Sequence, residues 1–177
     1  MAADLQAEAG SDTALSLIEQ LRAWQPAEAD TILATLRVRQ SRFDDAAAAL
    51  ESALLRFRVD PWPIRRFKEK ALTLSELLTR LHPGAARRLF DAMRQPFSLL
   101  ALEETRLVIL TDLSNRFDFV GTCREPIGAL EPNVPWTAPF LIARRDCYRA
   151  TNDPRLAAAT RDLEDFFAHE PLPLSPR

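Results

Sequence analysis

Apolar side chains recur every three or four residues along most of the chain, with polar side chains between them. This spacing places the apolar groups on one face of an α-helix. No segment alternates apolar and polar residues for long enough to predict a β-strand. The pattern predicts an all-α fold of about nine helices, at residues 12–24, 26–40, 43–58, 63–81, 85–94, 98–113, 117–130, 136–150 and 154–168.

Prolines separate the predicted helices. Pro26 and Pro154 stand at helix starts, where a missing backbone N–H costs nothing, and Asp153 can cap the last helix. Pro126 predicts a kink or break within residues 117–130. The short loops favour antiparallel neighbours. Only 4 glycines are present, too few for a β-rich fold or a phosphate-binding loop.

Residues 42–50, with the sequence RFDDAAAAL, contain four consecutive alanines on one predicted helix. We interpret Ala46 and Ala53 as contact positions, because a small side chain lets two helices approach closely. Ala48 and Ala49 fall to the side of the apolar stripe and favour helix formation without packing. The alanine run therefore indicates a helix that pairs with a neighbour.

The helices follow a repeating rhythm, because pairs begin near residues 26, 62, 97 and 136. This period is slightly longer than the ~34 residues of tetratricopeptide (TPR) repeats. The first pair resembles a TPR unit at Leu33-Ala34 and along its second helix. The matching positions of that helix and its closing proline are Phe43, Ala46, Leu50, Ala53 and Pro61. Asp30 and Arg37 depart from the family, which often has Trp and Tyr there.

The TPR resemblance covers residues 26–61, is weaker over 136–171, and rests on helix rhythm alone elsewhere. It implies an α-solenoid of antiparallel helix pairs, with one leading helix and about four pairs. A generic helical bundle is the alternative. On this view the chain has a disordered N-terminus at 1–11, a helical-repeat domain at 12–170 and a disordered proline-rich tail at 171–177.

A second resemblance rests on the segments DPWPIRRFKEKALTLSELL, RRLFDAMRQPF and EPNVPWTAPFLIARRDCYRA. In their order they are similar to the helical C-terminal extension of some bacterial multidomain proteins related to polyamine synthases. This resemblance implies an accessory helical domain of a larger enzyme or membrane-associated assembly. It transfers no catalysis, since the glycine-rich cofactor loop of that family is absent. The many arginines and alanines suggest a GC-rich bacterial genome.

Composition narrows the class of protein. The net charge of -2 lacks the excess of positive charge that is typical of nucleic-acid-binding proteins. No apolar run approaches the ~20 residues needed to span a bilayer, so no membrane insertion is expected. The N-terminal sequence MAADLQAEAGSD lacks the basic and apolar regions of a signal peptide. We therefore expect a soluble, cytoplasmic protein.

Residues that carry chemistry are few. His82 and His169 share no metal-ligand spacing with each other or with the cysteines. Cys123 and Cys147 fall on apolar helix faces, and we interpret them as buried free thiols rather than a disulfide. No motif of a catalytic site is present. The sequence predicts a protein that is not an enzyme and binds no metal or cofactor. A small-molecule or regulatory helical protein with a closed apolar pocket is a further alternative.

A basic cluster surrounds Trp62. Its members are Arg56, Arg58, Arg65, Arg66, Lys68 and Lys70. An aromatic side chain surrounded by arginines can bind a negatively charged nucleic-acid strand. We favour a solvated turn with Trp62 packed between repeats, because Asp60 and Glu69 dilute the charge.

The TPR resemblance implies a concave groove lined by the first helix of each pair, which holds a peptide or protein partner. By alignment, Val38 and Leu141 point outward into this groove, and the peptide-binding residues are Thr31, Thr35, Arg39, Arg145, Tyr148 and Arg149. Arginine can bind a partner carboxylate through two hydrogen bonds. The predicted function is a non-enzymatic, TPR-like interaction scaffold. The partner and the oligomeric state remain open.

Overall fold

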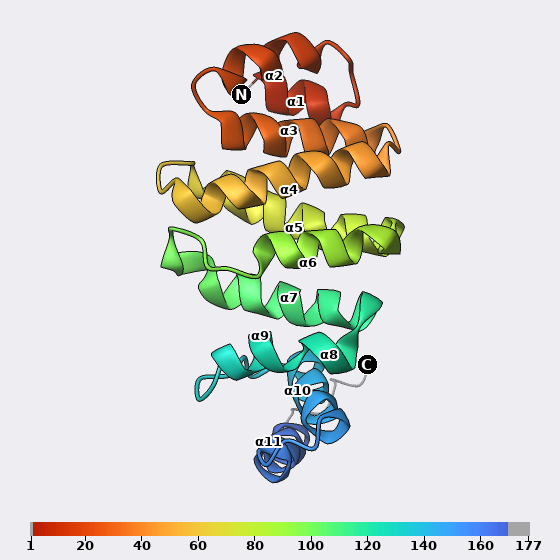
Figure 1. Ribbon diagram of the computed structural model, residues 1–177, viewed down its shortest axis with the longest axis vertical. Helices are drawn as coiled ribbons and strands as arrows, with labels where there is room; N and C mark the ends of the chain where they lie inside the picture. Colours follow the sequence, from red (N-terminus) through yellow and green to blue (C-terminus); the bar gives the residue numbers. More distant parts are fainter. Residues whose placement is uncertain (1, 170–177) are drawn as a thin grey trace, which may run out of the picture. The chain divides into compact units, whose positions relative to one another are not determined.

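The computed structural model describes residues 2–169, and every regular element in that range is a helix. This confirms the all-α prediction. The α-helices, labelled in Figure 1, are α1 Ala2–Glu8, α2 Ala14–Arg22, α3 Pro26–Arg39, α4 Phe43–Val59, α5 Arg65–Leu81, α6 Ala86–Met93, α7 Glu103–Phe117, α8 Phe119–Thr122, α9 Arg124–Ala129, α10 Ala138–Ala150 and α11 Leu156–His169. Short 3-10 helices at Pro83–Ala85 and Leu100–Leu102 precede α6 and α7.

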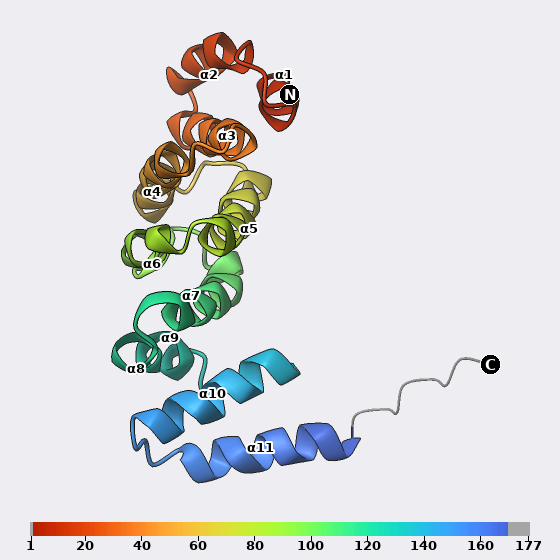
Figure 2. The ribbon, with the colours of Figure 1, turned by 90° about the vertical axis from the view of Figure 1, so that its right-hand side faces the viewer.

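The chain divides into two compact units between Phe117 and Asp118, where the sequence predicts one helical-repeat domain. Unit 1 contains α1 to α7, and unit 2 contains α8 to α11. In unit 1, α1, α3, α5 and α7 each contact the next helix of that series, and α4 contacts α6 (Figure 2). Consecutive helices from α1 to α5 also pack together, as do α6 and α7, and α3 with α4 is the most extensive such pair.

Small side chains allow α3 and α4 to pack closely. Ala46 and Ala53 are fully buried on α4, as the sequence predicts for contact positions. Ala48 is exposed, which confirms its place to the side of the apolar stripe. Ala49 is buried, so its assignment as filler is wrong. The buried stripe on α4 is therefore one residue wider than predicted.

Residues 2–8 form the helix α1, so the prediction of disorder is wrong for them, while the tail predicted to be disordered at 171–177 lies outside the described residues. Ala3 and Ala7 are buried in a core cluster shared with Ile18 of α2, Ile32 of α3 and Phe67 of α5. After α1 the chain turns at Gly10, whose φ of 71° is a left-handed conformation that glycine adopts without strain. Two alanines carry little hydrophobic signal, so the apolar pattern does not reveal this helix.

Most predicted helix boundaries lie within two residues of the observed ones, and two predicted helices differ more. The helix expected at 98–113 begins at Glu103, after the 3-10 turn. The helix expected at 117–130 is divided into α8 and α9 near Cys123, with Pro126 in the first turn of α9. Proline is tolerated in a first turn because the N–H it lacks has no partner within the helix. The predicted break therefore lies just before the proline.

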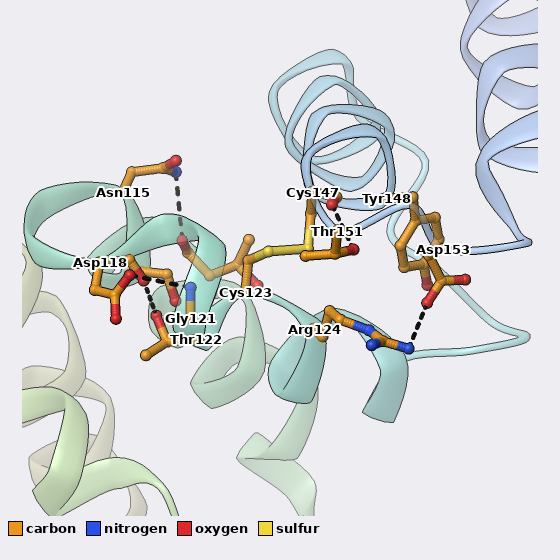
Figure 3. The surroundings of a disulfide bond; sticks show 12 residues. Asn115, Asp118, Gly121, Thr122, Cys123, Arg124, Cys147, Tyr148, Thr151 and Asp153 are labelled. Carbon is orange, nitrogen blue, oxygen red and sulfur yellow. Dashed lines mark hydrogen bonds and ion pairs between the residues drawn. A yellow bond between two sulfur atoms is a disulfide. The ribbon is translucent and has the colours of Figure 1, made fainter.

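Unit 2 contains a disulfide bond between Cys123 and Cys147 of α10, with Cα atoms 6.0 Å apart (Figure 3). The interpretation of these residues as free thiols is wrong. Their periodicity correctly indicates burial, since both are fully buried, but it carries no information on pairing. Structural disulfides are typical of oxidising compartments and rare in cytosolic proteins. The bond therefore does not favour the cytoplasmic location expected from the sequence.

Candidate functional site

An open pocket of about 290 Å³ lies between α3 and α5 of unit 1, beside the end of α1. Its lining residues are Glu8, Thr35, Val38, Arg39, Lys70, Thr73, Leu74 and Leu77. The α3 residues follow the spacing i, i+3, i+4 and the α5 residues the spacing i, i+3, i+4, i+7, which places each set on one helix face. The pocket therefore includes three of the α3 positions that the sequence predicts to face a groove.

The pocket combines an apolar wall with positive charge. Val38, Leu74 and Leu77 supply the apolar surface. Arg39 and Lys70 supply cations from opposite walls, and both pair with Glu8: Arg39 Nη2 lies 2.6 Å and Lys70 Nζ 2.7 Å from its carboxylate. The hydrogen bonds from Lys70 and Arg39 lower the pKa of Glu8. Its carboxylate is therefore held in the charged form.

A second carboxylate of α1 extends this ionic contact along α5. Asp4 lies 2.5 Å from Lys70 Nζ and 3.2 Å from Arg66 Nη2. Three cations from α3 and α5 thus bind two carboxylates of one short helix. Ala3 and Ala7 attach the other face of α1 to the core, while Leu5 remains exposed. The contact between α1 and the basic side chains of α3 and α5 is therefore mainly ionic.

Thr31 and Thr35 are both buried on α3. The Thr31 hydroxyl donates to the carbonyl oxygen of Ala27 at 2.9 Å, and that of Thr35 donates to the carbonyl oxygen of Thr31 at 3.0 Å. Thr35 still lines the pocket, whereas Thr31 is not among its lining residues. Each hydroxyl hydrogen is used within the helix, so neither threonine can donate a hydrogen bond to a partner in this arrangement.

The predicted residues of unit 2 lie on α10 in different environments. Arg145 and Arg149 share the carboxylate of Asp146, at 2.7 and 3.4 Å. Tyr148 is fully buried, and its hydroxyl donates to Glu131 at 2.7 Å. Tyr148 therefore belongs to the interior of unit 2, while the two arginines lie nearer its surface.

Buried ionic contacts surround Tyr148, and sequence reasoning missed them. Burial and the hydrogen bond to Glu131 raise the pKa of Tyr148 to about 12. The Arg155 guanidinium lies 4.5 Å from the centre of the tyrosine ring and donates to Asp153 at 2.8 and 2.9 Å. These contacts lower the pKa of the buried Asp153 carboxylate, with the hydrogen bond from Arg155 as the largest cause. The sequence predicts only a capping role for Asp153; in the structure its carboxylate accepts from the amide of Arg155, the residue before α11, at 3.0 Å.

The basic cluster around Trp62 does not form one surface. Lys68 is fully buried, and Arg58 donates to the backbone oxygens of Asp91 and Ala92. Trp62 is 88% exposed, so the prediction that it packs between repeats is wrong. The aromatic side chain is therefore available to solvent, while part of the surrounding charge is used within unit 1.

Fold and pocket define an all-helical protein with a basic, partly apolar groove on unit 1. No known protein family, curated protein or solved structure matches the chain. Within residues 2–169, no group of three or more His, Cys, Asp or Glu side chains is placed to hold a metal ion. No helix in the same range is long and apolar enough to cross a membrane.

Proposed function

We propose that the protein is a TPR-like α-solenoid scaffold that binds an acidic segment of a partner protein in the pocket between α3 and α5. The observation that carries the proposal is the ionic contact with α1. Asp4 and Glu8 form ion pairs with Arg39, Arg66 and Lys70. The chain's own acidic helix thus indicates the chemistry that this surface accepts.

The pocket also supplies apolar surface for specificity. Amphipathic helices bind grooves through apolar anchors three or four residues apart, while charged rims orient them. Val38, Leu74 and Leu77 can receive such an anchor, and the three cations can pair with acidic side chains beside it. Arg145 and Arg149 on α10 are proposed as additional carboxylate-binding groups of unit 2.

Competition within the chain provides the test. In full-length protein carrying Asp4→Lys and Glu8→Lys, α1 no longer neutralises the basic surface. A fluorescently labelled peptide with the sequence of residues 2–10 should then bind by anisotropy, and more tightly than it binds wild type. Adding Arg39→Glu and Lys70→Glu should abolish this binding.

Arg87→Glu is the matched control, because Arg87 is an exposed arginine of unit 1 paired with Asp91 on α6 rather than with α1. This change should leave peptide binding unaltered. Equal peptide affinity of wild type and all variants would disprove the proposed site.

A further inference from the structure

The helix α1 covers one part of the groove between α3 and α5 and leaves the other part open. Its two carboxylates contact successive turns of α5, because Asp4 pairs with Arg66 and Glu8 pairs with Lys70. Along its length α1 therefore advances toward the C-terminal end of α5. The next turns of α5 line the pocket, and Glu8 is itself a lining residue. The pocket thus begins where α1 ends.

The chain leaves this groove at Gly10. The positive φ of Gly10 turns the backbone, and the amide of Ser11 donates to the carbonyl oxygen of Gln6 at 3.0 Å. In a helix that continued, position 11 would follow Ala7 by four residues and Glu8 by three, so its side chain would lie between their two faces. Ala7 is buried in the core and Glu8 lines the pocket. A side chain at position 11 of a longer helix would therefore be directed at the open pocket.

Few contacts hold α1 on the groove. Its 7 residues are fewer than the about 12–15 that an isolated helix needs to be stable in water. Its buried side chains are the small Ala3 and Ala7, whereas Leu5 is 71% exposed. Ion pairs between partly exposed side chains, such as Glu8 with Arg39, contribute little in water. The helix α1 therefore belongs to the least stable part of unit 1, from which displaceable segments are drawn.

We propose that α1 is an autoinhibitory helix, and that the partner is a longer acidic helix that displaces α1 from the groove. This inference rests on the proposed function and adds the register in which the partner binds. The partner repeats the carboxylates of α1, at positions 4 and 8, and its small residues, at positions 3 and 7. It adds a large apolar side chain at position 11, which fills the pocket among Val38, Leu74 and Leu77.

The added apolar contact explains how a free partner can displace an attached helix. A segment tethered by a short linker has a millimolar effective concentration at its own site, so it outcompetes a free ligand with the same contacts. Burial of one leucine side chain raises affinity by a factor of roughly ten or more. On this model α1 excludes acidic segments that lack the apolar residue and yields to those that carry it.

Two peptides test the register. Both have the sequence of residues 2–15 with Gly10→Ala, which lets the helix continue. One peptide also carries Ser11→Leu, and the other carries Thr13→Leu, at a position on the opposite side of the helix. In isothermal titration calorimetry with the full-length wild type, the Ser11→Leu peptide should bind more tightly by roughly tenfold or more. Equal affinities would overturn the proposed register.

A matched pair of protein variants tests whether the added leucine lies in the pocket. Leu77 of the pocket and Leu55 of α4 are each 42% exposed. Leu77→Ser should remove the preference for the Ser11→Leu peptide, whereas Leu55→Ser should retain it. Circular dichroism checks that both variants fold. A preference that persists in Leu77→Ser would place the leucine elsewhere and refute the inference.

A dye attached to α1 tests displacement. Leu5→Cys introduces a thiol at an exposed position, and it is the only free one because Cys123 and Cys147 form the disulfide. When the unlabelled Ser11→Leu peptide binds, the dye should move more freely and its fluorescence anisotropy should fall. Unchanged anisotropy at saturation would show that the peptide binds beside α1. That result would overturn autoinhibition and leave the proposed function standing.

Failure of the proposed function gives a different result. In the variant with Asp4→Lys and Glu8→Lys, α1 no longer neutralises the cations of α3 and α5. If neither peptide binds this variant, the site for acidic segments is refuted, and the inference fails with it. If both peptides bind this variant with equal affinity, the site stands and the register alone is refuted.

Discussion

Units 1 and 2 achieve stability by different means. Unit 1 stacks seven helices on apolar contacts that run through α1 to α7. Unit 2 has far fewer buried apolar side chains, and it adds a disulfide bond to buried ion pairs of the kind that unit 1 also contains. Small bodies bury a smaller fraction of their surface, so they depend more on covalent and polar cross-links. We therefore expect mutations and changes of pH to affect the stability of the two units differently.

Removal of the disulfide should have the largest effect. The bond joins positions 24 residues apart, and closing a loop of this length stabilises a fold by about 3 kcal/mol. In Cys123→Ala/Cys147→Ala, hydrogen exchange should lose protection across α8 to α11 and keep it in α2 to α7. Wild type treated with a thiol reductant should behave in the same way. Retained protection in unit 2 would show that its helices do not depend on the bond.

Loss of the Asp153 charge should have the next largest effect. Asp153 accepts hydrogen bonds from Arg155 and lies 3.0 Å from Arg124 Nη2. Asp153→Asn retains the shape but removes the charge, and it should destabilise unit 2 by about 2 kcal/mol in urea unfolding. Asp146→Asn is the matched control, because this partly exposed carboxylate pairs with the solvent-accessible Arg145 and Arg149 of α10, and such pairs contribute little.

The pH dependence of unit 2 follows from the lowered pKa of Asp153. Its contribution to stability is fully present above the ordinary pKa of about 4 and is lost as pH falls through the lower folded-state value. Wild type should therefore lose more stability than Asp153→Asn on acidification. Parallel acid curves for the two proteins would contradict the role assigned to this carboxylate.

Overpacking of the α3–α4 contact should have a somewhat smaller effect, confined to unit 1. Ala46→Leu forces extra methylenes into a fully buried position and should cost about 1–3 kcal/mol. Ala48→Leu adds the same atoms at an exposed position two residues away and should change stability by less than about 0.5 kcal/mol. Urea unfolding measures both. Equal losses would contradict the helix face seen in the structure.

Ala46 and Ala48 also show how far the sequence predicts this fold. Helical periodicity located the long helices because their faces carry large apolar residues with clear spacing. The same signal failed for α1, where two alanines make the apolar contacts and carboxylates make the rest. It also treated Cys123 and Cys147 as unpaired, since pairing depends on tertiary distance rather than on periodicity.

The candidate site was predictable only where one helix face determines it. Thr35, Val38 and Arg39 share a face of α3, and all three line the pocket. The α5 wall was missed because its position opposite α3 is a tertiary property. The helix face of α10 does not predict that Tyr148 is fully buried and bonded to Glu131, since these are tertiary contacts. Exposed Trp62 likewise contradicts the usual expectation that large aromatic side chains are packed.

Lys68 gives the smallest and most selective test of the comparison. Buried Asp153 of unit 2 and buried Asp30 of unit 1 are ion-paired, whereas the fully buried Lys68 Nζ of unit 1 has no hydrogen-bond partner within residues 2–169 and lies 5.8 Å from the Phe57 ring centre. Lys68→Met keeps most of the apolar volume and removes the ammonium. It should stabilise unit 1 by roughly 1 kcal/mol in urea at neutral pH. Lys70→Met, at the only other lysine, should destabilise it, because Asp4 and Glu8 lose a partner.

Alkaline titration distinguishes the charge of Lys68 from its shape. Burial lowers the pKa of Lys68, so wild-type unit 1 should gain stability as pH rises between that value and the ordinary pKa of about 10.4. Lys68→Met should lack this gain. Unit 2 should show the opposite trend, because the pKa of Tyr148 is raised to about 12 and its contribution is lost above the ordinary value of about 10. A Met variant with the same alkaline gain as wild type would show that Lys68 is not its source, and the contrast between paired and unpaired buried charge would fail.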